Sequence, residues 1–217
     1  MLIRVRCRSW RRRSLLSLSQ QKGPLLVTGG AGTGKVFVAA KIHEAGSDPG
    51  SPFIVIDCQT LHESEAREFL FGSSHFLEEQ EDPSGIESLH RYGAIHLANE
   101  GTLVLRNVEA LASPAQKDLF NYLNRVRTGS LSYPRVRVMT TSRKGPAVLH
   151  GEHGLYPALA KELLQTVVTM PTLRARRKDI LPLARLFLEE RPDEKSPRLS
   201  TGAEHVLVSR RYGHRNV

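Results

Sequence analysis

Short apolar segments alternate with longer amphipathic ones along most of the chain. Short, almost continuously apolar runs are typical of strands that are buried on both faces, and the stretches between them, such as 114–127, have the periodicity of helices. Because strands and helices alternate, we expect an α/β fold with a parallel, helix-covered sheet. The predicted strands are residues 25–28, 52–57, 102–105, 135–141 and 166–170.

Two regions depart from this alternation. Residues 73–88 carry five acidic side chains together with Pro83 and Gly85, which predicts an acidic surface insertion. Residues 174–190 turn from basic to amphipathic, and a polar linker (191–198) joins them to another predicted helix at 199–212. We therefore expect three parts: a basic N-terminal arm (1–22), an α/β core (23–172) and a partial C-terminal helical lid (173–217).

Length and composition fit one α/β domain with a small appendage. The chain has 217 residues, of which 40% are hydrophobic, so it can bury a sizeable core. It contains no run of about 18 apolar residues, and no membrane-spanning helix is expected. The cysteines are Cys7 and Cys58, and Cys58 follows a strand that reads as buried, where a free thiol behaves as a small hydrophobic side chain. This cysteine usage favours a reducing, cytoplasmic location.

Positive charge is concentrated at the start of the chain. The formal net charge is +9, the first acidic residue is Glu44, and six arginines precede it within residues 1–13, at positions 4, 6, 8, 11, 12 and 13. This arm could be a solvated, poorly ordered tail, a non-specific contact for nucleic acid or acidic lipid, or a segment resembling a mitochondrial transit peptide. Trp10 is its one aromatic residue, so it has no aromatic series for stacking on bases.

The segment LLVTGGAGTGKV at 25–36 has the pattern of a phosphate-binding loop between a strand and a helix. Glycines let successive backbone N–H groups turn toward phosphate oxygens, the lysine reaches the outer phosphates, and the helix offers its N-terminus. A chance glycine-rich turn is the alternative. We predict an ATP or ADP site formed by Gly29, Gly30, Ala31, Gly32, Thr33, Gly34, Lys35 and Val36.

Metal binding has weak support in the sequence. The loop pattern usually ends in Ser or Thr, whose hydroxyl holds Mg²⁺, and Val36 stands there instead, which makes Mg²⁺ doubtful. His150 and His153 are flanked by glycines and have no cysteine nearby, so we interpret them as part of a surface turn. No metal site is predicted.

Several segments in order resemble the AAA+ domain of bacterial enhancer-binding proteins, which remodel RNA polymerase carrying sigma-54. The similarity extends from about Gly23 to Val217, in the segments VTGGAGTGKV, PFIVIDCQTL (52–61), EFLFG (68–72), YGAIHLANEGTLVL (92–105), SPAQKDLFNYL, VRVMTTS (136–142) and MPTLRARRKDILPLARLFLE (170–189). The resemblance implies a three-layer fold with a parallel sheet of about five strands, a small helical lid and assembly with other AAA+ protomers. That family often lacks a hydroxyl residue after the loop lysine, which weakens Val36 as an objection.

The second nucleotide motif of that family is altered here. In the family an apolar strand ends in Asp-Glu, where Asp organises Mg²⁺ and Glu polarises the attacking water. In this chain Arg106 and Asn107 follow the strand. A cation repels Mg²⁺ and an amide cannot act as a base. A one-residue misalignment is the alternative, but Glu109, the next carboxylate, falls on the wrong face of a strand continued by two residues.

Other functional parts of the family are also missing. The polymerase-contacting Gly-Ala-Phe-Thr-Gly-Ala loop has no counterpart in residues 73–90, so a sigma-54 polymerase contact is doubtful. Tyr156 and Glu162 occupy the positions of the arginine fingers, Ser142 occupies the sensor position, and the lid arginine would come just after Val217. We therefore predict no catalytic residue.

These observations favour an ATP-binding sigma-54 interaction module of a bacterial transcription regulator that does not hydrolyse ATP. One alternative is an active ATPase that remodels sigma-54 polymerase, and another is a non-functional fragment with non-specific affinity for nucleic acid. The sequence shows no DNA-binding helix-turn-helix and no sensor domain, which favours a fragment of a longer regulator. Oligomeric state and regulated genes do not follow from the sequence.

Overall fold

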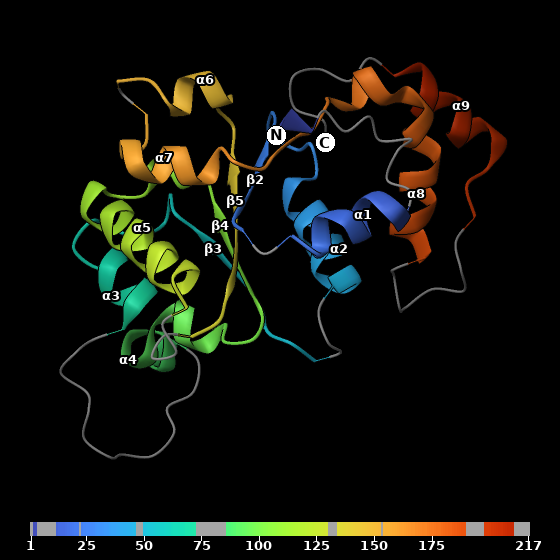
Figure 1. The fold of residues 1–217 in the computed structure, drawn as a ribbon. Coiled ribbons are helices and arrows are strands. Elements are labelled where there is room, and N and C mark those ends of the chain that lie inside the picture. The colour runs from blue at the N-terminus through green and yellow to red at the C-terminus, as the bar shows by residue number, and fades with distance from the viewer. Residues whose placement is uncertain are drawn as a thin grey trace.

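The computed structural model describes residues 2–3, 12–21, 23–46, 50–72, 86–129, 134–152, 154–189 and 198–210. Within them, all strands pair in parallel in one six-stranded sheet with the order β1-β6-β2-β5-β4-β3 (Figure 1). The strands are β1 (Leu2–Ile3), β2 (Leu25–Thr28), β3 (Phe53–Asp57), β4 (Thr102–Arg106), β5 (Arg137–Ser142) and β6 (Val167–Thr169).

Both faces of the sheet are buried, and successive side chains alternate between them. In β4, Leu103 and Leu105 join one core cluster, whereas Val104 joins the other. Val138 and Met139 in β5 divide in the same way. A strand that is buried on both faces needs apolar residues at consecutive positions, which explains why its sequence is a continuous apolar run.

Helices cover the two faces (Figure 1). One core cluster joins the sheet to α3 (Ala66–Phe71), α4 (Ile86–Leu97), α5 (Ser113–Arg127), α6 (Pro146–Leu149) and α7 (Pro157–Leu163). The other joins it to α1 (Arg12–Ser19) and α2 (Lys35–Gly46). After β6 the chain forms the 3₁₀ turn η3 (Leu173–Asp179), α8 (Ile180–Glu189) and α9 (Thr201–Ser209). Of these, α8 contacts α2, and α9 packs against α8 (Figure 1).

The predicted α/β fold is confirmed, and the five predicted strands correspond to β2 through β6. The sheet has one additional strand, because Leu2 and Ile3 pair with Val167 and Val168 at its edge. The predicted acidic insertion lies outside the described residues except for 86–88, which begin α4. Arg4, Arg6, Arg8, Arg11, His153, residues 191–197 and residues 211–217 also lie outside them. Among the described residues, no helix has the length and apolar character needed to cross a membrane.

The second half of the expected arm packs against the core. Leu18 of α1 is only 2% exposed and belongs to the cluster that contains α2. Arg137 of β5 donates from Nη1 to the carbonyl of Ser19 at 2.7 Å and from Nη2 to the carbonyl of Leu18. These carbonyls end α1, where backbone acceptors lack intrahelical partners and a cation is favourable. Arg137 therefore fastens α1 to the sheet, and residues 15–19 form part of the folded domain.

Replacing Arg137 with Gln should lower the free energy of unfolding by about 1–3 kcal/mol, because it removes charge-assisted hydrogen bonds to carbonyls that are shielded from water. Denaturant titration of both proteins measures the difference. Arg135→Gln is the matched control, since Arg135 lies exposed next to the same strand and should change stability by less than about 0.5 kcal/mol. Equal losses in the two variants would refute the anchoring role of Arg137.

Candidate nucleotide-binding site

Glycines in the loop between β2 and α2 adopt backbone conformations that other residues rarely adopt. Gly29 has a φ of +149°, and a Cβ there would lie 2.7 Å from the carbonyl oxygen of Met170. Gly34, with a φ of +81°, precedes Lys35, the first residue of α2. Between them the Thr33 side chain is fully buried and donates from Oγ1 to the Gly30 carbonyl at 2.9 Å. The loop is thus closed by its own contacts and leads directly into the α2 N-terminus.

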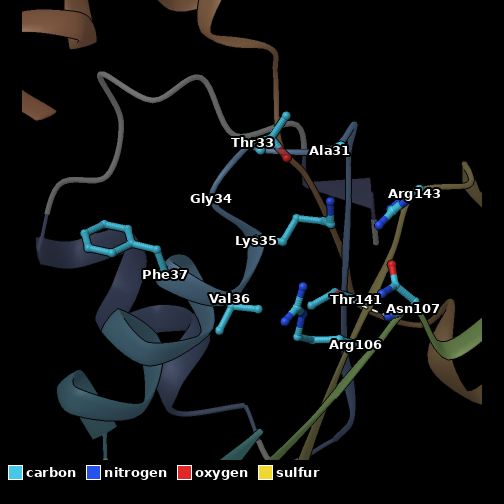
Figure 2. Close-up of a pocket in the computed structure, with 11 residues that line it drawn as sticks. Ala31, Thr33, Gly34, Lys35, Val36, Phe37, Arg106, Asn107, Thr141 and Arg143 are labelled. Atoms are coloured by element: carbon cyan, nitrogen blue, oxygen red, sulfur yellow. Dashed lines mark hydrogen bonds between the residues drawn. The ribbon is translucent and has the colours of Figure 1, made fainter. Parts of the chain in front are cut away.

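A pocket of about 360 Å³ opens beside this loop, between the ends of β4 and β5 (Figure 2). This volume is within the range of small-molecule sites. Thr28 of β2 is in register with Ser142 of β5, and β4 is the next strand, so the carboxyl ends of all three meet at one edge of the sheet. The lining residues are Ala31, Gly32, Thr33, Gly34, Lys35, Val36, Phe37, Arg106, Asn107, Thr141 and Arg143.

The charged residues that line the pocket are all basic. Lys35 donates from Nζ to the carbonyls of Gly29 and Gly30, both at 2.8 Å. Burial lowers the pKa of Lys35, and the charges of Arg143 and Arg106 lower it further. The charge of Glu109 acts in the opposite direction. Figure 2 shows Lys35, Arg106 and Arg143 extending toward the same space. Three cations and backbone N–H groups are features that suit the binding of a polyanion.

Arg106 and Asn107, the predicted replacements of the acidic pair, are held by Asp57 on the neighbouring strand. Asn107 is 3% exposed and donates from Nδ2 to Asp57 Oδ1 at 2.8 Å and to Gln59 Oε1 at 3.3 Å. Arg106 Nη2 lies 3.6 Å from Asp57 Oδ2. Burial opposes the ionisation of Asp57, but hydrogen bonds from Asn107 and the Gln59 N–H, with the charges of Arg106 and Arg143, outweigh it and lower the pKa.

Glu109 lies closer to the site than the sequence argument implied. The sequence predicted that the strand ending near Arg106 continues for two more residues. In the structure, Asn107 adopts a left-handed conformation with a φ of +51°, and the chain turns into η2 (Val108–Ala110). Glu109 accepts from the Arg143 N–H through Oε1 at 3.1 Å, and its Oε2 is buried without a hydrogen-bond partner. The expected continuation of the strand was wrong, because β4 ends at Arg106, and Glu109 is not among the residues that line the pocket.

The other predicted positions do not line the pocket. Ser142 is fully buried at the end of β5 and accepts from the Lys144 N–H at 2.9 Å, while its neighbour Arg143 reaches the pocket. Tyr156 precedes α7 and packs edge-on against Phe120, with ring centroids 6.0 Å apart. Glu162 lies in α7 and accepts a hydrogen bond from Gln165 Nε2 at 2.8 Å.

The lid also contacts the loop, which the sequence analysis did not foresee. Arg176 of η3 donates from Nη2 to the Thr33 carbonyl at 2.7 Å. Phe187 of α8 lies near Phe37 of α2, with ring centroids 6.1 Å apart. The only sequence signal was the basic run near Arg176, and basic residues that face solvent produce the same signal.

The lining residues fit a polyphosphate and do not fit a magnesium ion. Mg²⁺ requires near-octahedral oxygen coordination, usually with one or two carboxylates. None of the lining residues carries a carboxylate, and Val36 brings no hydroxyl. The Thr33 hydroxyl is engaged with Gly30, and Thr141 Oγ1 accepts from the Asn107 N–H at 3.3 Å.

Comparison with known proteins agrees with this architecture. The family model described as the sigma-54 interaction domain matches residues 8–142. The HTH-type transcriptional regulatory protein TyrR of Salmonella typhimurium is 28% identical over 202 residues, which cover 90% of this chain and 37% of TyrR. The probable regulatory protein HrpR of Pseudomonas syringae pv. syringae is 32% identical over 193 residues, covering 85% of this chain and 59% of HrpR.

Among solved structures, NtrX from Brucella abortus in complex with ATP has a TM-score of 0.72 at 22% identity and covers 99% of this chain and 49% of that chain. At this identity the likeness shows the fold. The chain spans little more than a third of the length of TyrR, so a regulator of that kind has further parts. The family match begins at residue 8, ahead of the expected start of the core, and it covers more than half of the chain. The chain therefore belongs to the sigma-54 interaction domain family.

Proposed function

We propose that the chain is a nucleotide-binding module of a cytoplasmic bacterial transcription regulator, and that it binds ATP or ADP without hydrolysing ATP at a useful rate. The observation that carries this proposal is the pocket itself, in which the phosphate-binding loop with its Lys35 lies opposite Arg106 and Arg143. In this proposal the loop N–H groups and Lys35 hold the outer phosphates, and the residues from 29 to 36 form the binding segment.

Two of the solved structures with this fold support the choice of ligand, because they are complexes of NtrX with ADP and with ATP. The contacts between lid and loop indicate how a nucleotide could act as a signal. Arg176 and Phe187 hold the lid against Thr33 and Phe37, which border the pocket. A ligand that shifts the loop would therefore also move the lid, and contacts with other AAA+ protomers could transmit that change.

Hydrolysis is disfavoured because several catalytic contributions are missing together. Asn107 cannot accept a proton from water, and its amide is already engaged with Asp57. Tyr156 and Glu162 provide no guanidinium for a neighbouring protomer. Loss of a general base costs roughly 10²–10⁴ in rate and loss of an arginine finger roughly 10³–10⁵, so even non-additive losses leave little turnover.

One observation favours the alternative of an active ATPase. Glu109 has a buried carboxylate oxygen without a hydrogen-bond partner, and its charge acts on Lys35 in the pocket. In this alternative, the carboxylate of Glu109, which acts on Lys35 through its charge, would serve as the base. The alternative thus names Glu109 as the residue on which turnover would depend.

Lys35→Met should weaken binding of ATP and ADP by at least about tenfold, because a charge-assisted hydrogen bond contributes roughly 1.5–3 kcal/mol and Met keeps only the apolar stem. Calorimetric titration measures both affinities. Lys161→Met is the control, since Lys161 is an exposed lysine on α7 away from the pocket. If wild type and Lys35→Met titrate alike, the loop is not a nucleotide site.

Wild-type protein should release almost no phosphate from ATP, and Arg106→Asp with Asn107→Glu should not restore turnover. That double variant should also be less stable, because the new Glu would stand where the Asn107 amide now lies 2.8 Å from Asp57 Oδ1. Adding Asp57→Asn should recover the stability and leave turnover low. Phosphate release and thermal melts measure the two effects.

A wild-type turnover near 1 s⁻¹, at the low end of the usual enzyme range of roughly 1–10³ s⁻¹, would contradict the hydrolysis-deficient assignment. If that turnover also disappears in Glu109→Gln, the active ATPase is the correct reading. Persistence of turnover in Glu109→Gln would exclude Glu109 as its base.

Contact between the 1–13 arm and nucleic acid, if it occurs, should be electrostatic and independent of sequence. Neutralising the arm tests this better than deleting it, because Leu2 and Ile3 pair with the sheet edge. We expect weak DNA retention at about 50 mM salt that disappears by about 200 mM and is lost when four arm arginines become Gln. Those arginines are Arg4, Arg6, Arg8 and Arg11.

A matched control changes the net charge equally at exposed positions elsewhere, namely Arg125, Arg127, Arg174 and Arg177. This control should keep DNA retention, and both quadruple variants should keep nucleotide binding. DNA retention that survives neutralisation of the arm, or that prefers one sequence, would place DNA recognition in the body of the domain.

A further inference from the structure

We infer that this site binds the metal-free form of a nucleoside polyphosphate, with Arg106 and Arg143 taking the place of Mg²⁺ as counter-charge. The inference rests on the proposed nucleotide-binding function and specifies the ligand of that same site. The residues that line the pocket do not fit a magnesium ion.

In phosphate-binding-loop proteins, Mg²⁺ is held by the residue after the loop lysine and by an acidic residue that ends a neighbouring strand. In this chain those positions are Val36 and Arg106, and both line the pocket (Figure 2). An isopropyl group offers no ligand and a guanidinium repels the ion. A positive charge of the protein therefore lines the pocket where an acidic ligand of the metal would be expected.

The guanidinium of Arg106 has a carboxylate beside it on the neighbouring strand. Asp57, directly opposite in the register of β3 and β4, lies 3.6 Å from it. Asp57 is fixed in turn by the Asn107 amide at 2.8 Å and by the Gln59 N–H at 3.2 Å. Asp57 is not among the residues that line the pocket, so it orients Arg106 without offering a carboxylate to a metal.

The charge balance also favours the metal-free ligand. Lys35, Arg106 and Arg143 all line the pocket, and no acidic side chain does. These cations can neutralise the oxygens of a free triphosphate or diphosphate, and Arg can pair with phosphate oxygens through two parallel hydrogen bonds. A nucleotide that already carries Mg²⁺ has less negative charge and brings a cation close to Arg106, so its complex with this site is weaker.

This arrangement has a consequence for the choice between nucleotides. Because ATP holds Mg²⁺ more tightly than ADP, excess Mg²⁺ removes more of the metal-free ATP than of the metal-free ADP. The site should therefore favour ADP over ATP whenever Mg²⁺ is abundant. With a chelator present, ATP regains its advantage in charge.

The test is calorimetric titration of the full chain with ATP and with ADP, in EDTA and in excess Mg²⁺ at equal ionic strength. Excess Mg²⁺ should weaken ATP binding by at least about tenfold and ADP binding by less, as expected if one or more charge-assisted contacts are lost. ATP binding that is equal or tighter in Mg²⁺ overturns this inference and leaves nucleotide binding intact. Absence of binding in both buffers overturns the proposed function itself.

Variants locate the effect. Arg106→Gln should lower ATP affinity in EDTA by roughly 10- to 100-fold and bring the ratio of the affinities in EDTA and Mg²⁺ close to one. Arg106→Lys, which keeps the charge, should retain a ratio above one and is the second measurement if the Gln variant melts early. Arg67→Gln is the control, because Arg67 pairs with Asp118 at 2.6 Å outside the pocket and should behave as wild type. An Arg106→Gln protein with the wild-type ratio overturns the role of Arg106.

Discussion

The parallel register of β2, β5 and β4 is the constraint on which the site depends. It brings the carboxyl ends of three strands to one edge, so the loop after Thr28, the side chain of Arg106 and that of Arg143 meet although they are far apart in sequence. The register is maintained because alternate side chains of these strands enter two separate apolar cores. A slip by one residue would exchange the two sets of side chains between the cores, and two buried faces make such a slip costly.

Those parts of the molecule that depend on local pattern could be predicted from the sequence. The apolar runs located β2 through β6, and the glycine-lysine loop located the pocket, because period and turn chemistry are local properties. The docking of α1 could not be predicted, since it depends on Arg137, more than one hundred residues away, contacting the carbonyls of Leu18 and Ser19. An arginine-rich segment gives the same sequence signal whether it is solvated or packed.

The contacts at the end of β4 could not be predicted from the sequence. The position of Glu109 depends on the left-handed conformation of Asn107, a residue type that adopts this conformation more readily than most. The role of Asp57 depends on its register with Arg106 across two strands. The spacing of the residues encodes neither the change of backbone direction nor the pairing of neighbouring strands. From spacing alone, Arg106 and Asn107 could be interpreted only as the loss of an acidic pair.

The contacts of Arg106 and Asn107 bear on whether the site has merely decayed. A substitution that places an amide at a buried position, such as that of Asn107, normally leaves polar groups without partners, which costs stability. Here the Asn107 amide has two acceptors, and Arg106 has a carboxylate opposite it on β3. These same groups lower the pKa of Asp57 against the effect of burial, which favours its ionised form. The two residues predicted to replace an acidic pair are thus both paired with Asp57, and the positive charge of Arg106 lines the pocket beside the glycine-lysine loop. This arrangement supports the proposal that the site still holds an anion over the alternative that it has lost its ligand.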